Sequence, residues 1–255
     1  MPLLRETWLV YRRQMRRQLR IPVWIIIGVV QPVLYLTLFG PLLKRVVAPG
    51  GIAHYNGTAW QFFVPGMLVQ LGLFGTAFSG FGIIDELRSG IIERMRVSPM
   101  SRLSMIFGRV LKDVTVLLVQ AAILVLLGLL YGLRAPWYGI LAGLGVMALL
   151  GTALAALSYS AGLVFKDEGA LAAIINFVTV PLLLLSGVLL PMTLAPGWLH
   201  DLSRANPLLY IVDGSRDMFR GAWTDSHLAI GVGCALVIAL IGMVVGTRTF
   251  RSDQA

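Results

Sequence analysis

The sequence predicts an all-α integral membrane protein with six transmembrane helices. Of its 255 residues, 57% are hydrophobic and only 13% are charged, whereas a soluble domain carries about 25% charged residues. The charged residues are also unevenly placed, and each uncharged run reaches the roughly 20 residues that a helix needs to cross the hydrocarbon core. These runs cover 21–43, 46–84, 114–133, 135–165, 169–200 and 226–247.

The basic residues predict which side of the membrane each loop occupies. Fifteen of the 21 Lys and Arg residues fall in the segments 1–20, 85–113, 166–168 and 248–255, against six elsewhere. Because cytoplasmic loops collect Lys and Arg, both termini are expected in the cytoplasm. The expected location is therefore the inner (plasma) membrane, with several passes. The net charge of +9 is then a topology signal, and no nucleic acid is expected as a partner.

Residues 1–20 predict an amphipathic helix that lies on the membrane surface. Apolar side chains recur at three- and four-residue spacing, and arginines occupy the opposite face. The apolar stripe consists of Leu4, Trp8, Tyr11, Met15 and Leu19. Trp8, Arg12, Arg13 and Arg16 are the residues expected to contact the bilayer interface. The alternative is a basic tail that only sets the topology.

The six predicted spans cover 22–43, 60–84, 114–133, 137–165, 170–190 and 227–247. The connection from Arg134 to Pro136 predicts a tight external turn, and Lys166 begins a short cytoplasmic one. Three prolines interrupt the segment 191–225, which nevertheless stays apolar. We therefore expect an external re-entrant segment of one or two short helices, since non-helical backbone at membrane depth needs protein or water around it.

The predicted spans offer no group that would power transport. Proton- or sodium-coupled carriers usually bury acidic or basic residues in the membrane, whereas these spans contain only neutral polar groups such as Gln120. A phosphate-binding P-loop needs Lys followed by Ser or Thr, but Lys44, Lys112 and Lys166 are followed by Arg, Asp and Asp. No nucleotide cofactor is expected in this chain, and energy must come from elsewhere.

Enzyme and metal signatures are equally sparse. The sequence has no G-x-S-x-G elbow and no H-E-x-x-H pair. His54, His200 and His227 lie far apart and near span ends, so they are interpreted as interfacial residues, and no metal site is expected.

The segment 85–102 between the second and third spans is predicted to be a coupling loop. Ile84, Leu87, Ile91 and Met95 form an apolar stripe at helical spacing. Ser98 followed by Pro99 predicts the start of a new helix. A short amphipathic helix there is suited to dock on a cytosolic partner and to transmit its motion. The alternative is a solvated, positively charged loop.

Two sets of motifs resemble the signature of type-2 ATP-binding-cassette (ABC) exporter permeases, and within them the daunorubicin-resistance type. The first set comprises Phe63-Val64-Pro65-Gly66-Met67-Leu68-Val69, Asp85, Gly90, Glu93-Arg94, Val97-Ser98-Pro99, Ser101-Arg102, Gly108-Arg109 and Asp113. The second comprises Leu189-Leu190-Pro191, Pro196-Gly197-Trp198, Asn206-Pro207 and Arg216 through Gly221. The resemblance spans nearly the whole chain, and the loop motif is the more specific part.

The resemblance implies a half-transporter that pairs with a second permease copy or a related permease and binds two copies of a cytosolic ABC ATPase. ATP and Mg would be bound by that partner subunit. The cargo would be a hydrophobic or amphiphilic drug, lipid or glycan. The ATPase-coupling residues would be Leu87, Gly90, Ile91, Glu93, Arg94, Val97, Pro99 and Arg102.

Aromatic and amide side chains inside the spans are the candidates for a cargo path, although such residues often serve only helix packing. They are Gln31, Tyr35, Gln70, Phe74, Asn176 and Phe177. Two other functions stay open on the residues alone. One is an integral-membrane lipid-modifying enzyme that uses the external Asp/Arg segment 213–220, and the other is a non-catalytic scaffold or channel.

Overall fold

The computed structural model describes residues 2–20, 23–46, 57–91, 101–189, 191–223 and 226–252, which fold into helices and short connections. The helices are α1 (Pro2–Arg20), α2 (Val23–Val46), α3 (Ala59–Ala77), α4 (Gly80–Arg88), α6 (Arg102–Leu130), α7 (Trp137–Phe165), α8 (Glu168–Leu184), the 3-10 helix η1 (Met192–Leu194), α9 (Gly197–Ser203), α10 (Pro207–Arg220) and α11 (Ser226–Ser252).

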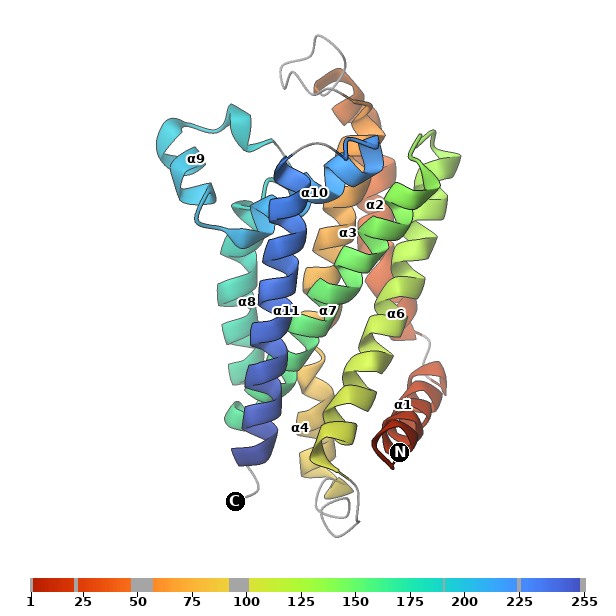
Figure 1. Ribbon diagram of the computed structural model, residues 1–255, viewed down its shortest axis with the longest axis vertical. Helices are drawn as coiled ribbons and strands as arrows, with labels where there is room; N and C mark the ends of the chain where they lie inside the picture. Colours follow the sequence, from red (N-terminus) through yellow and green to blue (C-terminus); the bar gives the residue numbers. More distant parts are fainter. Residues whose placement is uncertain are drawn as a thin grey trace.

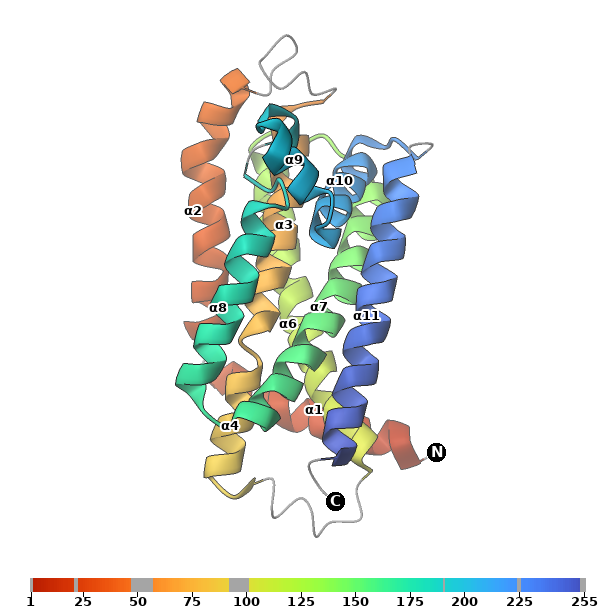
Figure 2. The same ribbon diagram turned by 90° about the vertical axis from the view of Figure 1, so that its left-hand side faces the viewer.

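The long helices stand side by side in a bundle, with α1 lying across one end (Figures 1 and 2). The end of α4, the start of α6 and the end of α11 lie at that same end, and α9 and α10 lie at the other. Helix α3 is central, because α2, α6, α7 and α10 all pack against it. Almost all of its side chains are buried, as expected for a helix that is apolar on every side.

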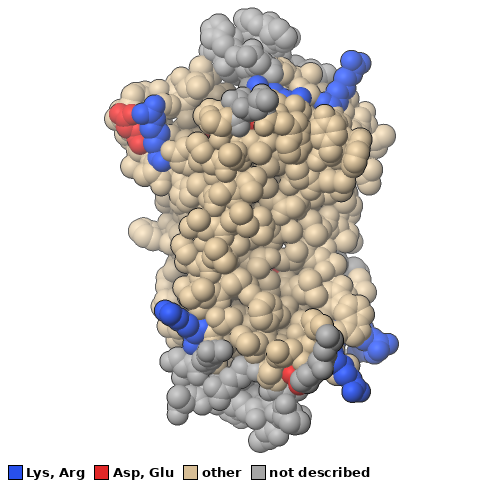
Figure 3. Space-filling view, viewed as in Figure 1, with Lys and Arg blue, Asp and Glu red and all other residues tan. Residues whose placement is uncertain are grey.

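Among the described residues, four helical segments are long and apolar enough to cross a membrane: Ala59–Arg88, Leu103–Leu130, Trp137–Phe165 and Ser226–Phe250. Two shorter apolar stretches, Ile26–Leu38 and Glu168–Leu184, accompany them. The broad middle belt of the molecule is almost free of charged side chains on the face shown in Figure 3, and Lys and Arg gather toward both ends. The protein is therefore a multi-pass membrane protein, and the count of six spans stays a prediction.

The predicted boundaries around the coupling loop are wrong. Helix α4 continues to Arg88, and α6 begins at Arg102, twelve residues before the predicted third span. Ser101 caps α6, because its side chain accepts a hydrogen bond from the Ser104 amide. The error has a physical cause: Arg109 and Asp113 were assigned to a loop because they are charged, but they are buried within the bundle.

The segment after α8 forms the short helices η1, α9 and α10 at the end opposite α1 (Figure 1). Helix α10 begins where Asn206 caps the Leu208 amide and Pro207 occupies the first turn. It ends at Gly221, whose φ of 77° favours glycine. Its contacts with α3, α7 and α11 hold it against the bundle, whereas α9 stands away from the bundle (Figure 1).

Candidate functional site

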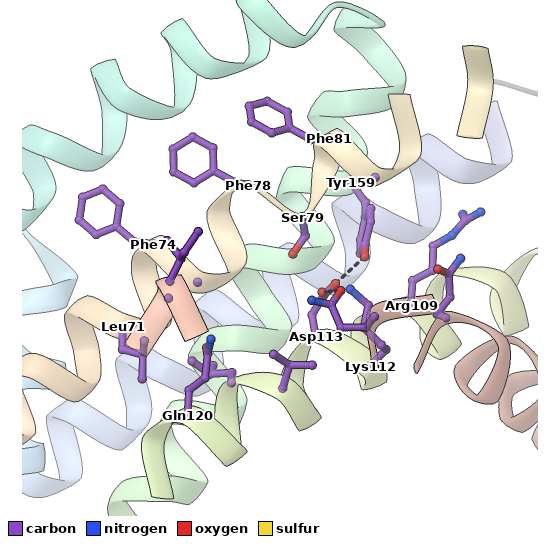
Figure 4. A pocket seen from close by; sticks show the side chains of 18 of the residues that line it. Leu71, Phe74, Phe78, Ser79, Phe81, Arg109, Lys112, Asp113, Gln120 and Tyr159 are labelled. Atoms are coloured by element: carbon purple, nitrogen blue, oxygen red, sulfur yellow. Dashed lines mark hydrogen bonds and ion pairs between the residues drawn. The ribbon is translucent and has the colours of Figure 1, made fainter. Parts of the chain in front are cut away.

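A cavity of about 900 Å³ opens between the helices in the half of the bundle nearer to α1. Residues of α1, α2, α3, α4, α6, α7 and α8 line it. Its wall contains the three phenylalanines Phe74, Phe78 and Phe81, which follow one another along α3 and α4 (Figure 4). Gln70 and Gln120 also line the cavity. This part of the wall suits an apolar or aromatic group with a few polar atoms.

The end of the cavity beside α1 is charged, and its centre is Glu86. The Glu86 carboxylate pairs with Arg109 of α6 and accepts a hydrogen bond of 2.6 Å from the amide of Gln14 on α1. Arg17 of α1 lies 3.5 Å from Glu86 and 2.5 Å from Asp85. Glu86 is 3% exposed and Arg109 is 2% exposed, so both charges depend on protein partners rather than on bulk water.

A second buried carboxylate, Asp113, lies in the same part of the cavity. It accepts a hydrogen bond of 2.5 Å from the Tyr159 hydroxyl of α7 and pairs with Lys112. Figure 4 shows these side chains together near Arg109, beyond the row of phenylalanines. The sequence reasoning missed this cluster because Arg109, Lys112 and Asp113 were placed in the cytoplasmic connection 85–113 and not in a span. The available signal was the i, i+4 spacing of Arg109 and Asp113, which puts both on one helix face.

Three of the six predicted path residues, Gln31, Gln70 and Phe74, line the cavity. The other three do not. Tyr35 is partly buried and packs against the main core. Asn176 and Phe177 are exposed on α8, and Phe177 is 82% exposed. The structure thus divides the candidates into three that line the cavity and three that do not.

The predicted coupling residues lie only partly within the described residues. Leu87 is partly buried against the core near α4, and Ile91 is half-buried. Gly90 has a φ of 67°, which ends the helix. Ile91 therefore does not continue the helix of Ile84 and Leu87, and the prediction of one continuous stripe was wrong at this point. Glu93, Arg94, Val97 and Pro99 lie outside the described residues, and Arg102 is described only as the first residue of α6.

Helix α1 has three faces rather than the two that the sequence suggested. The apolar stripe points away from the bundle, since Leu4 is 70% and Trp8 57% exposed. The arginines at 12, 13 and 16 are exposed as well. A third face packs on the protein: Val10 is 2% exposed, and a Cβ on Gly108 of α6 would lie only 2.6 Å from the Val10 Cβ.

Polar contacts on this third face tie α1 to α6 as well as to α4. The carboxylate of Glu6 accepts hydrogen bonds of 2.9 Å from the Ser101 amide and from the Ser104 hydroxyl, at the start of α6. The amide of Ser101, followed by the hydroxyl of Ser104, lowers the pKa of Glu6 because both stabilise the charged carboxylate. Helix α1 is thus bonded to both helices that flank the coupling loop, and movement of either would move it.

The segment 213–220, considered above as an enzyme site, packs against the bundle. The Arg216 guanidinium is 3% exposed and lies 3.6 Å from the centre of the Phe62 ring. It donates hydrogen bonds of 3.1 Å to the Phe62 carbonyl and 2.8 Å to the Gly187 carbonyl. Arg216 therefore joins α10 to α3 and to the end of the α8 region.

Comparisons with known proteins agree over nearly the whole chain. The family model described as ABC-2 type transporter matches residues 5–219. A putative transport permease, ycf38 of Cyanophora paradoxa, is 28% identical, with 97% of this chain and 88% of the relative covered. The daunorubicin resistance ABC transporter permease protein DrrB1 of Streptomyces coeruleorubidus is 26% identical, with 92% and 82% covered. A probable doxorubicin resistance ABC transporter permease protein, DrrC of Mycobacterium tuberculosis, is 22% identical, with 95% and 82% covered.

The extent of the family match decides between the functions that the residues left open. Permeases of this family are transport components, not enzymes by themselves, and membership implies an ATP-binding partner subunit and pairing with another permease. The chain belongs to the ABC-2 type transporter family and is a transmembrane permease subunit of an ABC exporter.

Proposed function

We propose that the chain forms the membrane part of an exporter that moves a drug-sized amphiphile outward through the cavity described above. ATP and Mg, bound by two copies of a cytosolic ATPase, supply the energy, and a second copy of the permease or a related permease completes the transporter. The observation that carries the proposal is the cavity, which has an aromatic wall at one end and a charged cluster at the other. Its volume falls in the range of roughly 300–1,000 Å³ that drug-sized ligands occupy.

The proposed topology has six spans, with α2 and α8 as the first and the fifth. The protein would lie in the inner (plasma) membrane, with both termini in the cytoplasm. Its support is the charge distribution, since segments with fifteen of the 21 basic residues fall on the proposed cytoplasmic side. Helix α1, the end of α4, the start of α6 and the end of α11 lie at one end of the bundle (Figure 2). On this topology, the exposed apolar stripe of α1 lies in the cytoplasmic leaflet and its arginines face anionic headgroups.

The proposed cargo class follows from the cavity wall. Phe74, Phe78 and Phe81 offer an apolar surface for aromatic contact, and the amides of Gln31 and Gln70 offer hydrogen bonds. The names of two relatives refer to resistance to daunorubicin and doxorubicin, which supports a drug-like amphiphile over a glycan chain.

The proposed coupling route starts at the loop 85–102. The ATPase would contact the segment around Glu93 and Arg94, and its closure would push on α4 and α6. The route is supported by the ion pairs of Asp85 and Glu86 with Arg17, and by the bonds of Glu6 to the start of α6. These contacts join α1 to both helices, so a push on the loop would reach the charged end of the cavity.

The partner is tested by copurification from native membranes. The wild-type chain should bring down a P-loop ATPase in equal amount, and Glu93→Arg should lose it while still inserting into the membrane. The matched control is Arg204→Glu, a charge reversal at an exposed position next to α9, which should retain the ATPase. Full ATPase recovery with Glu93→Arg, together with unimpaired transport, would refute the assigned role of the loop.

The path is tested by comparing two phenylalanines in reconstituted vesicles that contain the ATPase. Phe74→Ala removes aromatic surface from the cavity, whereas Phe177→Ala removes it from the outer face of α8. We expect Phe74→Ala to lower the rate of amphiphile transport about tenfold, the effect of losing an aromatic contact plus its buried area, and Phe177→Ala to change it less than twofold. The reverse order of effects would place the path along the exposed face of α8 instead.

A further inference from the structure

The long apolar segment Ala59–Arg88 is not one helix, because a break at Phe78 and Ser79 separates α3 from α4. Around the break, backbone hydrogen bonds span three residues instead of four. They run from the Ser79 amide to the Thr76 carbonyl, from Phe81 to Phe78 and from Gly82 to Ser79, at 3.1–3.2 Å. This shift leaves the Gly80 amide and the Ala77 carbonyl without their usual helical partners, at a depth where unpaired polar groups are costly.

A single hydroxyl from α7 satisfies both groups. The Ser158 Oγ accepts a hydrogen bond of 2.8 Å from the Gly80 amide and donates its own proton to the Ala77 carbonyl. Ser158 is 5% exposed, so water does not substitute for it. A side chain inserted into the hydrogen-bond ladder is a recognised cause of a helix kink.

The two helices also touch at the break through glycines. A Cβ on Gly80 would lie 2.3 Å from the Ser158 carbonyl oxygen, and a Cβ on Gly162 would lie 2.7 Å from the Gly80 carbonyl oxygen. The α4 and α7 backbones therefore approach each other closely at the break.

We infer that the break is a hinge and that Ser158 is a positioning residue, which holds α4 in the bent orientation. If the three short-range bonds convert to normal α-helical bonds, each residue turns about 20° less, so α4 rotates by roughly 60° and the segment shortens by about 1.5 Å. The backbone groups at the break then satisfy each other, and Ser158 is released. The role of this movement in transport rests on the proposed function, but the hinge itself does not.

Rotation of α4 would act on the cavity directly. Helix α4 carries Asp85 and Glu86, which bond to α1 and α6, and Arg88, which lies 2.9 Å from Glu168 of α8. The break itself places Phe78 in the cavity wall, and α4 adds Phe81. A rotation of this size would exchange the contacts of the charged end and turn the aromatic wall, so a push on the coupling loop would change the shape of the cavity.

The hinge is tested by a pair of serines on α7. Ser158→Ala removes the hydroxyl from the break, and Ser160→Ala removes one that is equally buried but bonds to the Ala156 carbonyl of its own helix. The reporter is the pair Arg88→Cys and Glu168→Cys in a Cys234→Ser background, joined in membranes by a short, reducible bifunctional thiol reagent.

Loss of the bonds to the break should lower the cross-linking rate about fivefold in Ser158→Ala, the population change that one net hydrogen bond produces. Ser160→Ala should leave the rate unchanged. Equal rates in both variants would overturn the hinge, whether or not the vesicles transport any cargo.

A second measurement uses the native Ser158 and does not depend on how the alanine variant folds. Cross-linking the 88–168 pair in the complete transporter should stop transport, and reduction of the reagent should restore it. Full transport by the cross-linked protein would show that α4 does not move. A rate difference between the serine variants without any measurable transport would keep the hinge and reject the proposed function.

Discussion

Replacing Glu86 with Gln tests whether the charges between α4 and α6 belong to the folded core or to a solvated loop. The substitution keeps the shape of the side chain and removes its charge. Arg109, which is 2% exposed, then loses the only carboxylate that the structure pairs with it among the described residues. Its Nε and Nη1 have no hydrogen-bond partner within that same part of the chain, so the loss is not made up elsewhere.

The expected cost follows from the burial of both partners. Breaking a buried ion pair by removing one partner costs about 3–5 kcal/mol, because an uncompensated charge stays in the interior. Because Glu86 and Arg109 border the cavity and are not fully enclosed by protein, we expect the lower end of this range, about 3 kcal/mol. A pair in a solvated loop, the alternative that the sequence left open, would cost less than about 1 kcal/mol.

The free energy of unfolding in lipid bicelles provides the measurement, in a double-mutant cycle of Glu86→Gln and Arg109→Met. The double variant should lose about 2 kcal/mol less stability than the sum of the losses of the two single variants, since neither charge is left alone. Glu168→Gln is the control, because its pair with Arg88 is exposed on both sides and should cost below about 1 kcal/mol. Additive losses, or a Glu86→Gln loss no larger than that of the control, would refute the reasoning.

Two further predictions concern helix contacts. Gly139→Ala should destabilise the protein by about 2 kcal/mol or more, because a Cβ at this position would lie 2.0 Å from the Met218 carbonyl oxygen of α10. Gly145→Ala, the control on the same helix, places its Cβ in open space and should be neutral or stabilising. Equal unfolding free energies for the two variants would contradict the packing of α7 on α10. The pKa of Glu6 is lowered in the folded protein, so its contribution to stability is complete above the ordinary glutamate pKa and is lost as the pH falls through the lowered value. The docking of α1 can be monitored by the rate of proteolysis after residue 20 while the pH is lowered. This rate should rise at acidic pH in the wild type and should not change with pH in Glu6→Gln. Identical acid profiles would exclude Glu6 as the group that holds Ser101.

Sequence patterns located the apolar helices well where charges mark true ends. The predicted span 137–165 has the same bounds as α7, because Arg134 and Lys166 lie just outside an uncharged run. The apolar stripe of α1 was also predicted, and Leu4, Trp8 and Leu19 of this stripe are exposed. In both places the deciding quantity is local: the hydrophobicity of consecutive residues and their spacing on a helix.

The same rule failed where charges pair across the bundle. Arg109 and Asp113 looked like loop residues, yet α6 runs through both. Their partners, Glu86 and Tyr159, are separated from them by 23 and 46 residues. A charge marks a helix end only when water must solvate it, and a partner from another helix removes that need.

The sequence by itself determined that this is a membrane protein, the approximate position of its long helices and, through its motifs, its family. Each of these depends on residue type and short-range order. Only the tertiary structure decided which residues surround the cavity, which charges are buried and where the 59–88 segment breaks. The break depends on a hydroxyl 78 residues away from Gly80 in the chain. Such contacts join helices that are distant in sequence, and the energy of each exists only once the bundle has brought both groups out of water and together.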